Sequence, residues 1–574
     1  VVLDVGTWLT VTGADPQSTP AVYRDVLVWK GLITARQQGL RLALKNDPQF
    51  ADFRRVTQQL STVSLNPPQP PSNPEALAAW KIREPELRQA WEDQKMTLQA
   101  DHERLEKELA VKSVAFRESL EQRRVQPDDL VATLKAQDRP TALVDVLEYG
   151  YYGRKSRNEK RERRIVAFVV RGDQPVARVE LGSANAIGEQ VAQWRDAILQ
   201  KTDGQQLGEE LRKRVWLPLE PHLQGIDTVL VSTDGVLGLL PFEALPGKAD
   251  GTLLIEDYRL AYVPVPQLIP GMLSKPGRSF ASERLLLVGD VDYGSDAAGE
   301  STPWKPLGGT AEELQALSKL HLSVFPAADG FMALRGADAT EGQVVERLGK
   351  FQILHFATHG LFEQQEHRLI PSSQAFAGSR GAELLSSVSD HGQQTVKVAR
   401  SGLVLAGANH RPDVRLNGSE PKVTDDGLLM ENEILAMSLE NASLVVMSAC
   451  DTAQGKQQGG EGLLGIQRAF QVAGARTTIA SLWQVDDAAT VLLMQRFYEN
   501  LWSGKLSRLD ALRDAQLWML RSGKQAIRES ARRAIARGQE TRGAEILLDD
   551  LDKSQNDRLP PYYWAAFVLS GDWR

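Results

Sequence analysis

Two residues with catalytic potential follow two strand-like apolar runs. The run FQILHFATHG brings His359 and Gly360 just past a predicted strand, and LVVMSACDT places Cys450 in the same position. A thiol with a pKa of about 8.5 is mostly protonated at neutral pH and needs a base or a cation beside it to become a nucleophile. An imidazole can act as that base, which is worth roughly 10² to 10⁴ in rate. If the two runs are neighbours, the sequence predicts nucleophilic catalysis by Cys450 with His359 as its base.

The backbone around this pair offers donors for a developing oxyanion. Gly360 lets its N–H approach a substrate closely, and the N–H of Cys450 is a second donor; losing one such donor typically costs about 3–4 kcal/mol. Each side chain also has a structural interpretation, because a lone cysteine at the end of an apolar strand is often a small buried hydrophobe. His355 alternates with Leu354 and Phe356 within the strand. We therefore expect His355 to be a hydrogen-bonded core residue or a support for the site.

The elements that must position these residues are short apolar strands that alternate with amphipathic helices. The strand-like runs are TVLVS (228–232), RLLLVGD (284–290), FQILHFA (351–357), SLVVMSA (443–449) and RTTIASLW (476–483). The helical patterns lie at 186–214, 310–320, 340–348, 463–473 and 487–501. This alternation predicts the α/β class, with a parallel sheet covered by helices on both faces. Ligands of such sheets bind beyond the carboxyl ends of the strands, where His359 and Cys450 are expected to face one crevice.

The chain divides into three predicted regions. Residues 1–135 form a helical region, residues 136–204 form a β-hairpin and α linker whose strands are ALVDVLEY and RIVAFVV, and residues 205–574 form the α/β domain. Residues 363–424 interrupt the α/β rhythm with polar residues and little periodicity, so we expect mostly a long surface loop. The glycines of GGEGLLG (459–465) are attributed to loop flexibility.

Composition narrows the possible functions. The net charge of −7 gives no general attraction to nucleic acid or to an anionic membrane face. No apolar run is long enough for a membrane span and no leader is recognised, so the expected location is the cytoplasm, although residue 1 is Val and an upstream module stays open. A single cysteine fits a reducing compartment and excludes disulfides and cysteine-cluster metal sites. Motifs for phosphate loops, serine nucleophile elbows and zinc helices are missing, so no cofactor and no metal are expected.

Several blocks, in the right order, resemble the CHAT domain, a caspase-like family related to separase. They are STDGVLGLLPFEALP (232–246), LLLVGDVDY (285–293), HFATHG, SGLVLAGAN (401–409), VVMSACDT, GEGLLGIQRAFQVAGARTTIASLWQVDD and PPYYWAAFVLSGD. The similarity covers about residues 205–574. The segment before it resembles the region that precedes this domain in longer proteins, whose amino-terminal part is commonly a tetratricopeptide array.

The resemblance implies peptide-bond cleavage by a Cys/His dyad, with His359 and Cys450 at the family positions. In relatives, an acidic residue near the block that contains Trp483 binds a basic P1 side chain. Asp486 and Asp487 lie in that block and Asp451 lies beside the nucleophile, so these residues and Trp483 are substrate-binding candidates. Asp486 and Asp487 have an equal alternative as helix caps, and Trp483 has one as a core residue.

The resulting hypothesis is a cysteine endopeptidase that cuts a specific protein partner. A regulatory or sensor module, upstream or in trans, is the expected second partner. Ala453 stands where the family commonly has glycine, which supports an alternative in which the domain is a catalytically inactive scaffold for protein interaction. A third hypothesis, a hydrolase of non-peptide acyl bonds, uses the same dyad with a different pocket.

Overall fold

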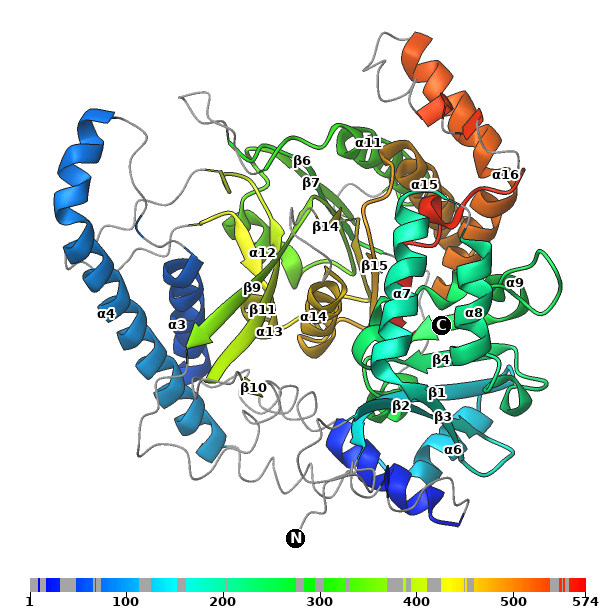
Figure 1. Ribbon diagram of the computed structural model, residues 1–574. Coiled ribbons are helices and arrows are strands. Elements are labelled where there is room, and N and C mark those ends of the chain that lie inside the picture. Colours follow the sequence, from blue (N-terminus) through cyan, green and yellow to red (C-terminus); the bar gives the residue numbers. More distant parts are fainter. Residues whose placement is uncertain are drawn as a thin grey trace.

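The computed structural model describes the chain as an α/β protein with helices on its amino-terminal side (Figure 1). The described residues are 9–10, 17–30, 48–65, 68, 74–112, 125–151, 162–202, 204–274, 283–294, 304–326, 330–368, 386–388, 394–409, 425–448, 450–451, 459–536, 547–549, 551–552 and 557–574. Within them, the α/β region occupies the centre and right of Figure 1, and the long amino-terminal helices lie at its left.

A mostly parallel sheet forms the centre of the protein. Its strands are β1 (Thr141–Tyr151), β2 (Glu162–Arg171), β3 (Ala177–Ser183), β4 (Thr228–Ser232), β5 (Arg259–Tyr262), β6 (Leu285–Val291), β7 (Phe331–Gly336), β8 (Ile353–Ala357), β13 (Leu444–Met447), β15 (Thr477–Ser481) and β16 (Phe567–Gly571). Within the described ranges, these eleven strands follow the order β3-β2-β1-β4-β5-β16-β15-β13-β8-β6-β7. Seven of the ten neighbouring pairs are parallel, as the continuously apolar strand sequences predicted.

The sheet consists of two halves that run in opposite directions. In the β8 half, the strands β15, β13, β8, β6 and β7 are mutually parallel. In the β4 half, the strands β1, β4, β5 and β16 are mutually parallel. The two halves meet at β15 and β16, which pair antiparallel. The carboxyl ends of the two sets of strands therefore lie at opposite edges of the sheet.

Helices cover both faces of the β8 half. The helices concerned are α11 (Gly308–Val324), α12 (Glu341–Leu348), α14 (Gly459–Val472) and α15 (Asp487–Trp502). Leu285 and Leu287 of β6 share one core with residues of α11 and α15, whereas Leu286 and Val288 share a second core with residues of α12 and α14. Because alternate side chains of a strand point to opposite faces, both faces of this half are buried. Four of the five predicted strands (β6, β8, β13 and β15) and four predicted helices lie in this half and are confirmed, and the fifth predicted strand is β4 of the other half.

The predicted hairpin is also present and extends the sheet. Strands β1 and β2 pair antiparallel, while β1 pairs in parallel with β4 on its other side. The hairpin is followed by α7 (Ala184–Leu199) and α8 (Gln205–Val215), where a helical pattern was predicted. Residues 152–161, which connect the two strands of the hairpin, lie outside the described residues.

A second sheet corrects the prediction of a long loop at 363–424. Its strands are β9 (His359–Arg368), β10 (Ser386–Val388), β11 (Gln394–Val404), β12 (Leu428–Met430) and β14 (Cys450–Asp451). Strands β9 and β11 form an antiparallel pair over nine residues, from Gly360 to Arg368 on β9. The prediction failed because this two-stranded ribbon is rich in Gln, Glu, Ser and Thr and lacks the apolar run that marks a core strand. Residues 405–409, which follow β11, are also described, and the remainder of 363–424 lies outside the described residues.

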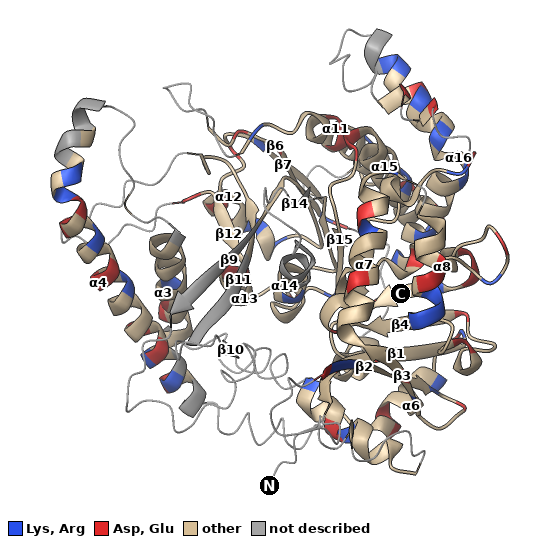
Figure 2. Ribbon diagram, viewed as in Figure 1, with Lys and Arg blue, Asp and Glu red and all other residues tan. Residues whose placement is uncertain are grey.

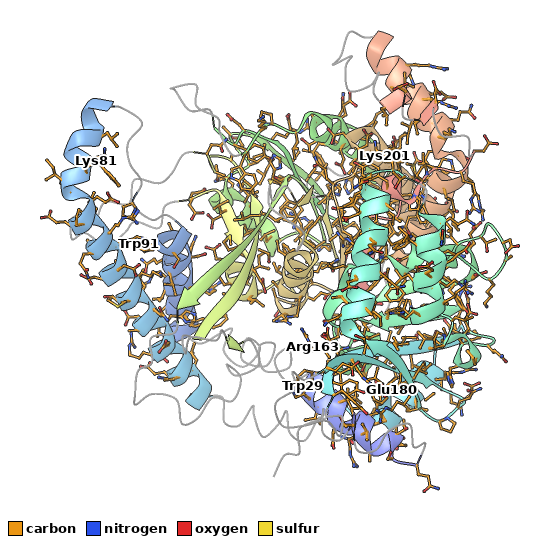
Figure 3. All side chains as sticks on the ribbon, viewed as in Figure 1. Trp29, Lys81, Trp91, Arg163, Glu180 and Lys201 are labelled. Atoms are coloured by element: carbon orange, nitrogen blue, oxygen red, sulfur yellow. The ribbon has the colours of Figure 1, made fainter. Side chains whose placement is uncertain are left out.

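The amino-terminal region is helical where it is described. It includes a helix at 19–30, α3 (Pro48–Leu65), the 39-residue α4 (Pro74–Lys112) and α6 (Pro127–Lys135). Trp91 of α4 lies between α4 and α3 (Figure 3), and its indole N–H donates to the carbonyl of Val63 at 2.7 Å. Figure 2 shows acidic and basic residues interspersed along the ribbon of α4, as expected for a solvated helix that packs along one narrow face.

Candidate active site

The strands that carry the predicted dyad are neighbours. Strand β13 pairs in parallel with β8, with Leu444 opposite Ile353 and Met447 opposite Phe356. The amide of Ser448 then donates to the carbonyl of Phe356 at 2.8 Å, so the two chains stay side by side beyond the core sheet. The expectation that these two strands are adjacent is confirmed.

His359 and Cys450 are opposite each other in the ladder that follows. Strand β14 pairs in parallel with the start of β9, where Cys450 is the partner of His359 and Asp451 the partner of Gly360. Neighbouring strands are about 4.8 Å apart, so the two backbones meet at the distance that a thiol and an imidazole can bridge. His359 is thus the first residue of β9. The side chains of Cys450 and Asp451 lie outside the described side chains.

The imidazole of His359 is held in an aromatic enclosure. Only 5% of the residue is exposed, and its ring lies 5.0 Å from the ring of Tyr293 and 5.4 Å from that of Trp304, measured between centroids. Burial lowers the pKa of His359, and the hydrogen bond to the Lys305 carbonyl opposes this effect only in part. The imidazole is therefore neutral at pH 7 and able to accept a proton.

A backbone carbonyl selects the tautomer of His359. The Nε2 atom lies 2.7 Å from the carbonyl oxygen of Lys305. Because a carbonyl only accepts, Nε2 carries the proton and Nδ1 carries the lone pair in the neutral ring. The Nδ1 atom is buried, and no group among the described residues bonds to it. The ring thus offers one basic nitrogen whose expected partner is the undescribed thiol of Cys450.

The residue before the histidine is fixed by two hydroxyl groups. The Thr358 hydroxyl donates to the carbonyl of Val404 on β11 and lies 2.9 Å from the Tyr293 hydroxyl. Burial raises the pKa of Tyr293 to about 12, so this phenol stays neutral while its ring packs on His359. The turn from β8 into β9 is therefore held from two elements.

A buried polar cluster lies behind the site. His355 of β8 is fully buried, with Nε2 at 3.1 Å from Glu313 Oε1 and Nδ1 at 3.2 Å from the Tyr498 hydroxyl. The other oxygen of Glu313 accepts from the Ser448 hydroxyl at 3.3 Å. The expectation that His355 is a hydrogen-bonded core residue is confirmed. Through Glu313, this cluster ties α11 to the segment that leads into Cys450.

The other predicted residues of the site serve identifiable contacts. Asp486 caps α15, since its carboxylate accepts from the amides of Ala488 and Ala489 at 3.0 and 3.2 Å. Burial, reinforced by the charge of Asp487, raises the pKa of Asp486 against the opposing amide bonds. Asp487 accepts from the amide of Gly309 at 3.0 Å, which joins α15 to the start of α11.

Trp483 lies in the core rather than on an open surface. Only 4% of this residue is exposed, and its indole N–H donates to the carbonyl of Tyr562 at 3.0 Å. Strand β15 and the residues just after it thus contribute packing at this point. Asp451 has its backbone in the ladder opposite Gly360, as described above.

Gly465 is required for close packing of α14 against Glu431 and Ser401, and not for loop flexibility. It lies within α14, so the interpretation of 459–465 as a loop is wrong. A side chain on Gly465 would come within 2.7 Å of Glu431 and 3.2 Å of the Ser401 hydroxyl. That hydroxyl donates to Glu431 at 2.9 Å, and burial raises the pKa of the Glu431 carboxyl. The missing side chain of Gly465 leaves room for this pair between α14 and β11.

Sequence reasoning missed several contacts of the site. The Lys305 carbonyl has no signature, because any residue type supplies a carbonyl. Tyr293 and Trp304 lie well before His359 in the chain, and only the block LLLVGDVDY ending at Tyr293 pointed to this region. Glu313 sits on an ordinary amphipathic helix, where one more acidic residue is not distinctive.

Membrane-spanning helices and clustered metal ligands are both absent from the described residues. None of the described helices is long and apolar enough to cross a membrane. No group of three or more His, Cys, Asp or Glu residues within the described ranges is arranged to hold a metal ion.

The fold and the register of β9 and β14 define the class as an α/β protein in which neighbouring parallel strands bring a histidine and a cysteine to the same edge of the sheet. A family model described as the CHAT domain matches residues 205–572, more than half of the chain. The chain therefore belongs to the CHAT domain family, as the resemblance of its sequence blocks predicted.

Known proteins are similar to this chain at low identity. Tetratricopeptide repeat protein 28 of Mus musculus is 26% identical over 300 residues, which are 50% of this chain and 11% of that protein. The protein of the same name from Homo sapiens is 26% identical over 294 residues, with the same coverage. The chain thus spans about a tenth of the length of these relatives. A crystal structure of the Saccharomyces cerevisiae separase-securin complex matches with a TM-score of 0.41 and 9% identity, over 98% of this chain and 42% of that one.

Proposed function

We propose that the chain is a cysteine endopeptidase in which Cys450 is the nucleophile and His359 is the general base. The observation that carries this proposal is the pairing of Cys450 with His359 across two short parallel strands. A histidine with a fixed tautomer and a basic nitrogen free of described partners supports it. Membership of the CHAT domain family gives independent support.

The proposed reaction begins with transfer of the thiol proton of Cys450 to Nδ1 of His359. The imidazolium keeps its Nε2–H bond to the Lys305 carbonyl, which stabilises the positive charge. The thiolate attacks the peptide carbonyl carbon, and the backbone N–H groups of Gly360 and Cys450 bind the oxyanion that forms. The imidazolium then gives its proton to the leaving amine. Water hydrolyses the thioester with His359 again acting as base.

The proposed substrate is a specific protein partner. Asp451 and Asp487 remain the candidates for a basic P1 side chain, since Asp486 is engaged as a helix cap and Trp483 is buried. The relatives are named for tetratricopeptide repeats. We propose that a module of this kind, upstream or in trans, regulates cleavage, and that the single cysteine operates in the reducing cytoplasm.

The test compares the parent protein with Cys450→Ala and His359→Ala. Each is incubated with a peptide library and with a thiol-reactive acyloxymethyl ketone probe. Cleavage and labelling by the parent alone support the proposal. Silence of the parent with its full-length partner present favours the inactive scaffold, for which Ala453 is the sequence observation. Turnover of small esters without turnover of peptides favours the acyl hydrolase.

A further inference from the structure

Asn409 joins two backbone segments beside His359. Its side-chain oxygen accepts from the amide of Trp304 at 3.1 Å. Its side-chain nitrogen donates to the carbonyls of Trp304 and Gly294 at 2.8 and 2.9 Å. Its own backbone amide donates to the carbonyl of Tyr293 at 2.8 Å. This one residue therefore makes four hydrogen bonds to two backbone segments, one at Tyr293 and Gly294 and the other at Trp304.

The chemistry of these contacts requires an asparagine. The site needs one acceptor and two donors on a short side chain, which is what a primary amide supplies. Aspartate is of similar size but donates nothing, and serine has a single donor. The same pattern fixes the orientation of the Asn409 amide, because only its nitrogen can donate to two carbonyls.

The segments that Asn409 holds supply the described polar contact of His359 and two of its ring contacts. Lys305, whose carbonyl accepts the Nε2–H bond, directly follows Trp304 in the chain. The rings of Trp304 and Tyr293 lie against the imidazole. Displacing the Trp304 backbone would therefore move the carbonyl and one of the rings together.

We propose that Asn409 is a positioning residue for the general base, which holds the Lys305 carbonyl where it fixes the tautomer and orientation of His359. This inference rests on the proposed function for the role of His359, but it adds a residue that acts through the backbone of Trp304 and Lys305. Without the amide, Nε2–H loses a fixed acceptor and the ring can adopt the other tautomer or rotate. Loss of the partner that orients a metal-ligating histidine typically costs about 10- to 100-fold in affinity or activity, and we expect a loss of similar size here.

The single cysteine gives a direct readout of this effect. Because Cys450 is the chain's one thiol, the rate of alkylation by iodoacetamide reports on it alone. The rate is measured from pH 5 to pH 10 for the parent, Asn409→Ala, Asn409→Asp and His359→Ala. The matched control is Asn441→Ala, since Asn441 also donates to a backbone carbonyl, that of Gly349 at 3.0 Å, but precedes β13 at the opposite edge of the sheet.

We expect the parent and Asn441→Ala to alkylate with a midpoint below that of a free thiol. Both Asn409 variants and His359→Ala should move the midpoint toward about 8.5. At pH 6.5, alkylation of the Asn409 variants should be about tenfold slower or more, and kcat for a cleaved peptide should fall while KM stays unchanged. Asn409→Asp should behave like Asn409→Ala, because it keeps the size but loses both donors.

The outcomes separate this inference from the proposed function. If His359→Ala leaves the alkylation profile of the parent unchanged, the dyad itself is wrong. If His359→Ala shifts the profile and folded Asn409 variants do not, only the role of Asn409 is overturned. If neither Asn409 variant folds while Asn441→Ala does, the amide serves the fold and the positioning role is lost.

Discussion

The two halves of the sheet differ in how the polar side chains at the carboxyl ends of their strands are hydrogen-bonded. In the β4 half, Asp145 of β1 lies beside Ser232, the last residue of β4. The ammonium of Lys30, from the helix at 19–30, contacts Asp145 at 2.6 Å, the Ser232 hydroxyl at 2.8 Å and the Val146 carbonyl at 2.6 Å. Tyr23 of the same helix donates to the second oxygen of Asp145 at 3.2 Å. The polar groups of this edge therefore satisfy one another.

In the β8 half, the corresponding edge keeps one group available. His359 uses Nε2 for the Lys305 carbonyl, while Nδ1 has no partner among the described residues. Both edges lie at the end of neighbouring parallel strands, where ligands of such sheets bind. The comparison indicates that strand topology alone does not make a site. The β4 half uses its polar groups to attach the amino-terminal helix, whereas the β8 half has a histidine nitrogen without a described partner, to which we assign the role of base.

The largest expected effect is the loss of peptidase activity when His359, in the β8 half, is replaced. His359→Ala removes the base, and we expect kcat/KM for a cleaved peptide to fall by about 10² to 10⁴. Asp234→Asn, beyond the end of β4, is the control in the other half, and it should leave kcat/KM within about twofold. Peptide hydrolysis measures both. Equal losses of kcat/KM in the two variants would contradict the proposal that only the β8 half carries the active site.

The second effect concerns stability in the β4 half. The side chains of Lys30 and Asp145 are 8% and 1% exposed, so Lys30→Met would leave a buried carboxylate without its cation. Breaking one partner of a buried pair typically costs about 3–5 kcal/mol in the free energy of unfolding. Urea denaturation measures it, and Lys81→Met on the exposed side of α4 is the control. A loss below about 1 kcal/mol for Lys30→Met would show that the pair does not anchor this helix.

The third effect tests the cluster behind the dyad. Glu313 is 3% exposed, and Glu313→Ala would leave His355 and the Ser448 hydroxyl without their shared acceptor. We expect a loss of about 1–3 kcal/mol in the free energy of unfolding. Glu312→Ala, the exposed neighbour on α11, should change it by less than about 0.5 kcal/mol. If both variants unfold at the same urea concentration as the parent, Glu313 does not contribute to the stability of the fold.

Features of the fold and the site that leave a pattern in neighbouring residues could be predicted from the sequence. Contacts between residues far apart in the chain could not. The continuously apolar strands that carry His359 and Cys450 identified the parallel sheet, because burial on both faces leaves a local mark. His355 was recognised as a core residue from its neighbours Leu354 and Phe356. The Lys30 to Asp145 pair spans 115 positions, and neither residue is distinctive alone. The ribbon of β9 and β11 was missed because its sequence is mostly polar apart from the buried end of β11 at Leu403 and Val404, so it lacks this pattern.

The comparison of the halves extends to a second amino-terminal helix. Helix α3 docks on the β8 half, where Gln58 donates to Glu341 at 3.1 Å and Thr62 bonds to Asp426. Glu433, at the start of α13 (Glu431–Leu435), accepts from the Met430 amide nearby. The helix at 19–30 thus binds to the β4 half through an ion pair of opposite charges. Helix α3 instead packs on the β8 half at a group of carboxyl side chains.

These carboxyl groups have raised pKa values in the folded protein. Burial, followed by the charges of Glu433, Asp426 and Asp425, raises the pKa of Glu341 to about 10. Burial also raises the pKa of Glu433 to about 8 and that of Asp426 to about 6. Because the unfolded chain releases these protons near pH 4, the stabilising effect is fully present below that pH. It is lost as the pH rises through the folded values.

The smallest effect in this series is therefore a pH dependence of the stability with which α3 packs on the β8 half. Glu341→Gln keeps the acceptor for Gln58 but needs no proton, so we expect it to be more stable than the parent at pH 8 by about 1 kcal/mol and similar to it at pH 5. Hydrogen exchange locates the effect: protection of α3 in the parent should fall from pH 5 to pH 8, after correction for the intrinsic rate, and protection of the helix at 19–30 should not. Glu346→Gln, on the exposed side of α12, is the control. A parallel loss in both helices would mean that α3 is not held by the protonated carboxyl groups and that the two halves attach their helices by the same physics.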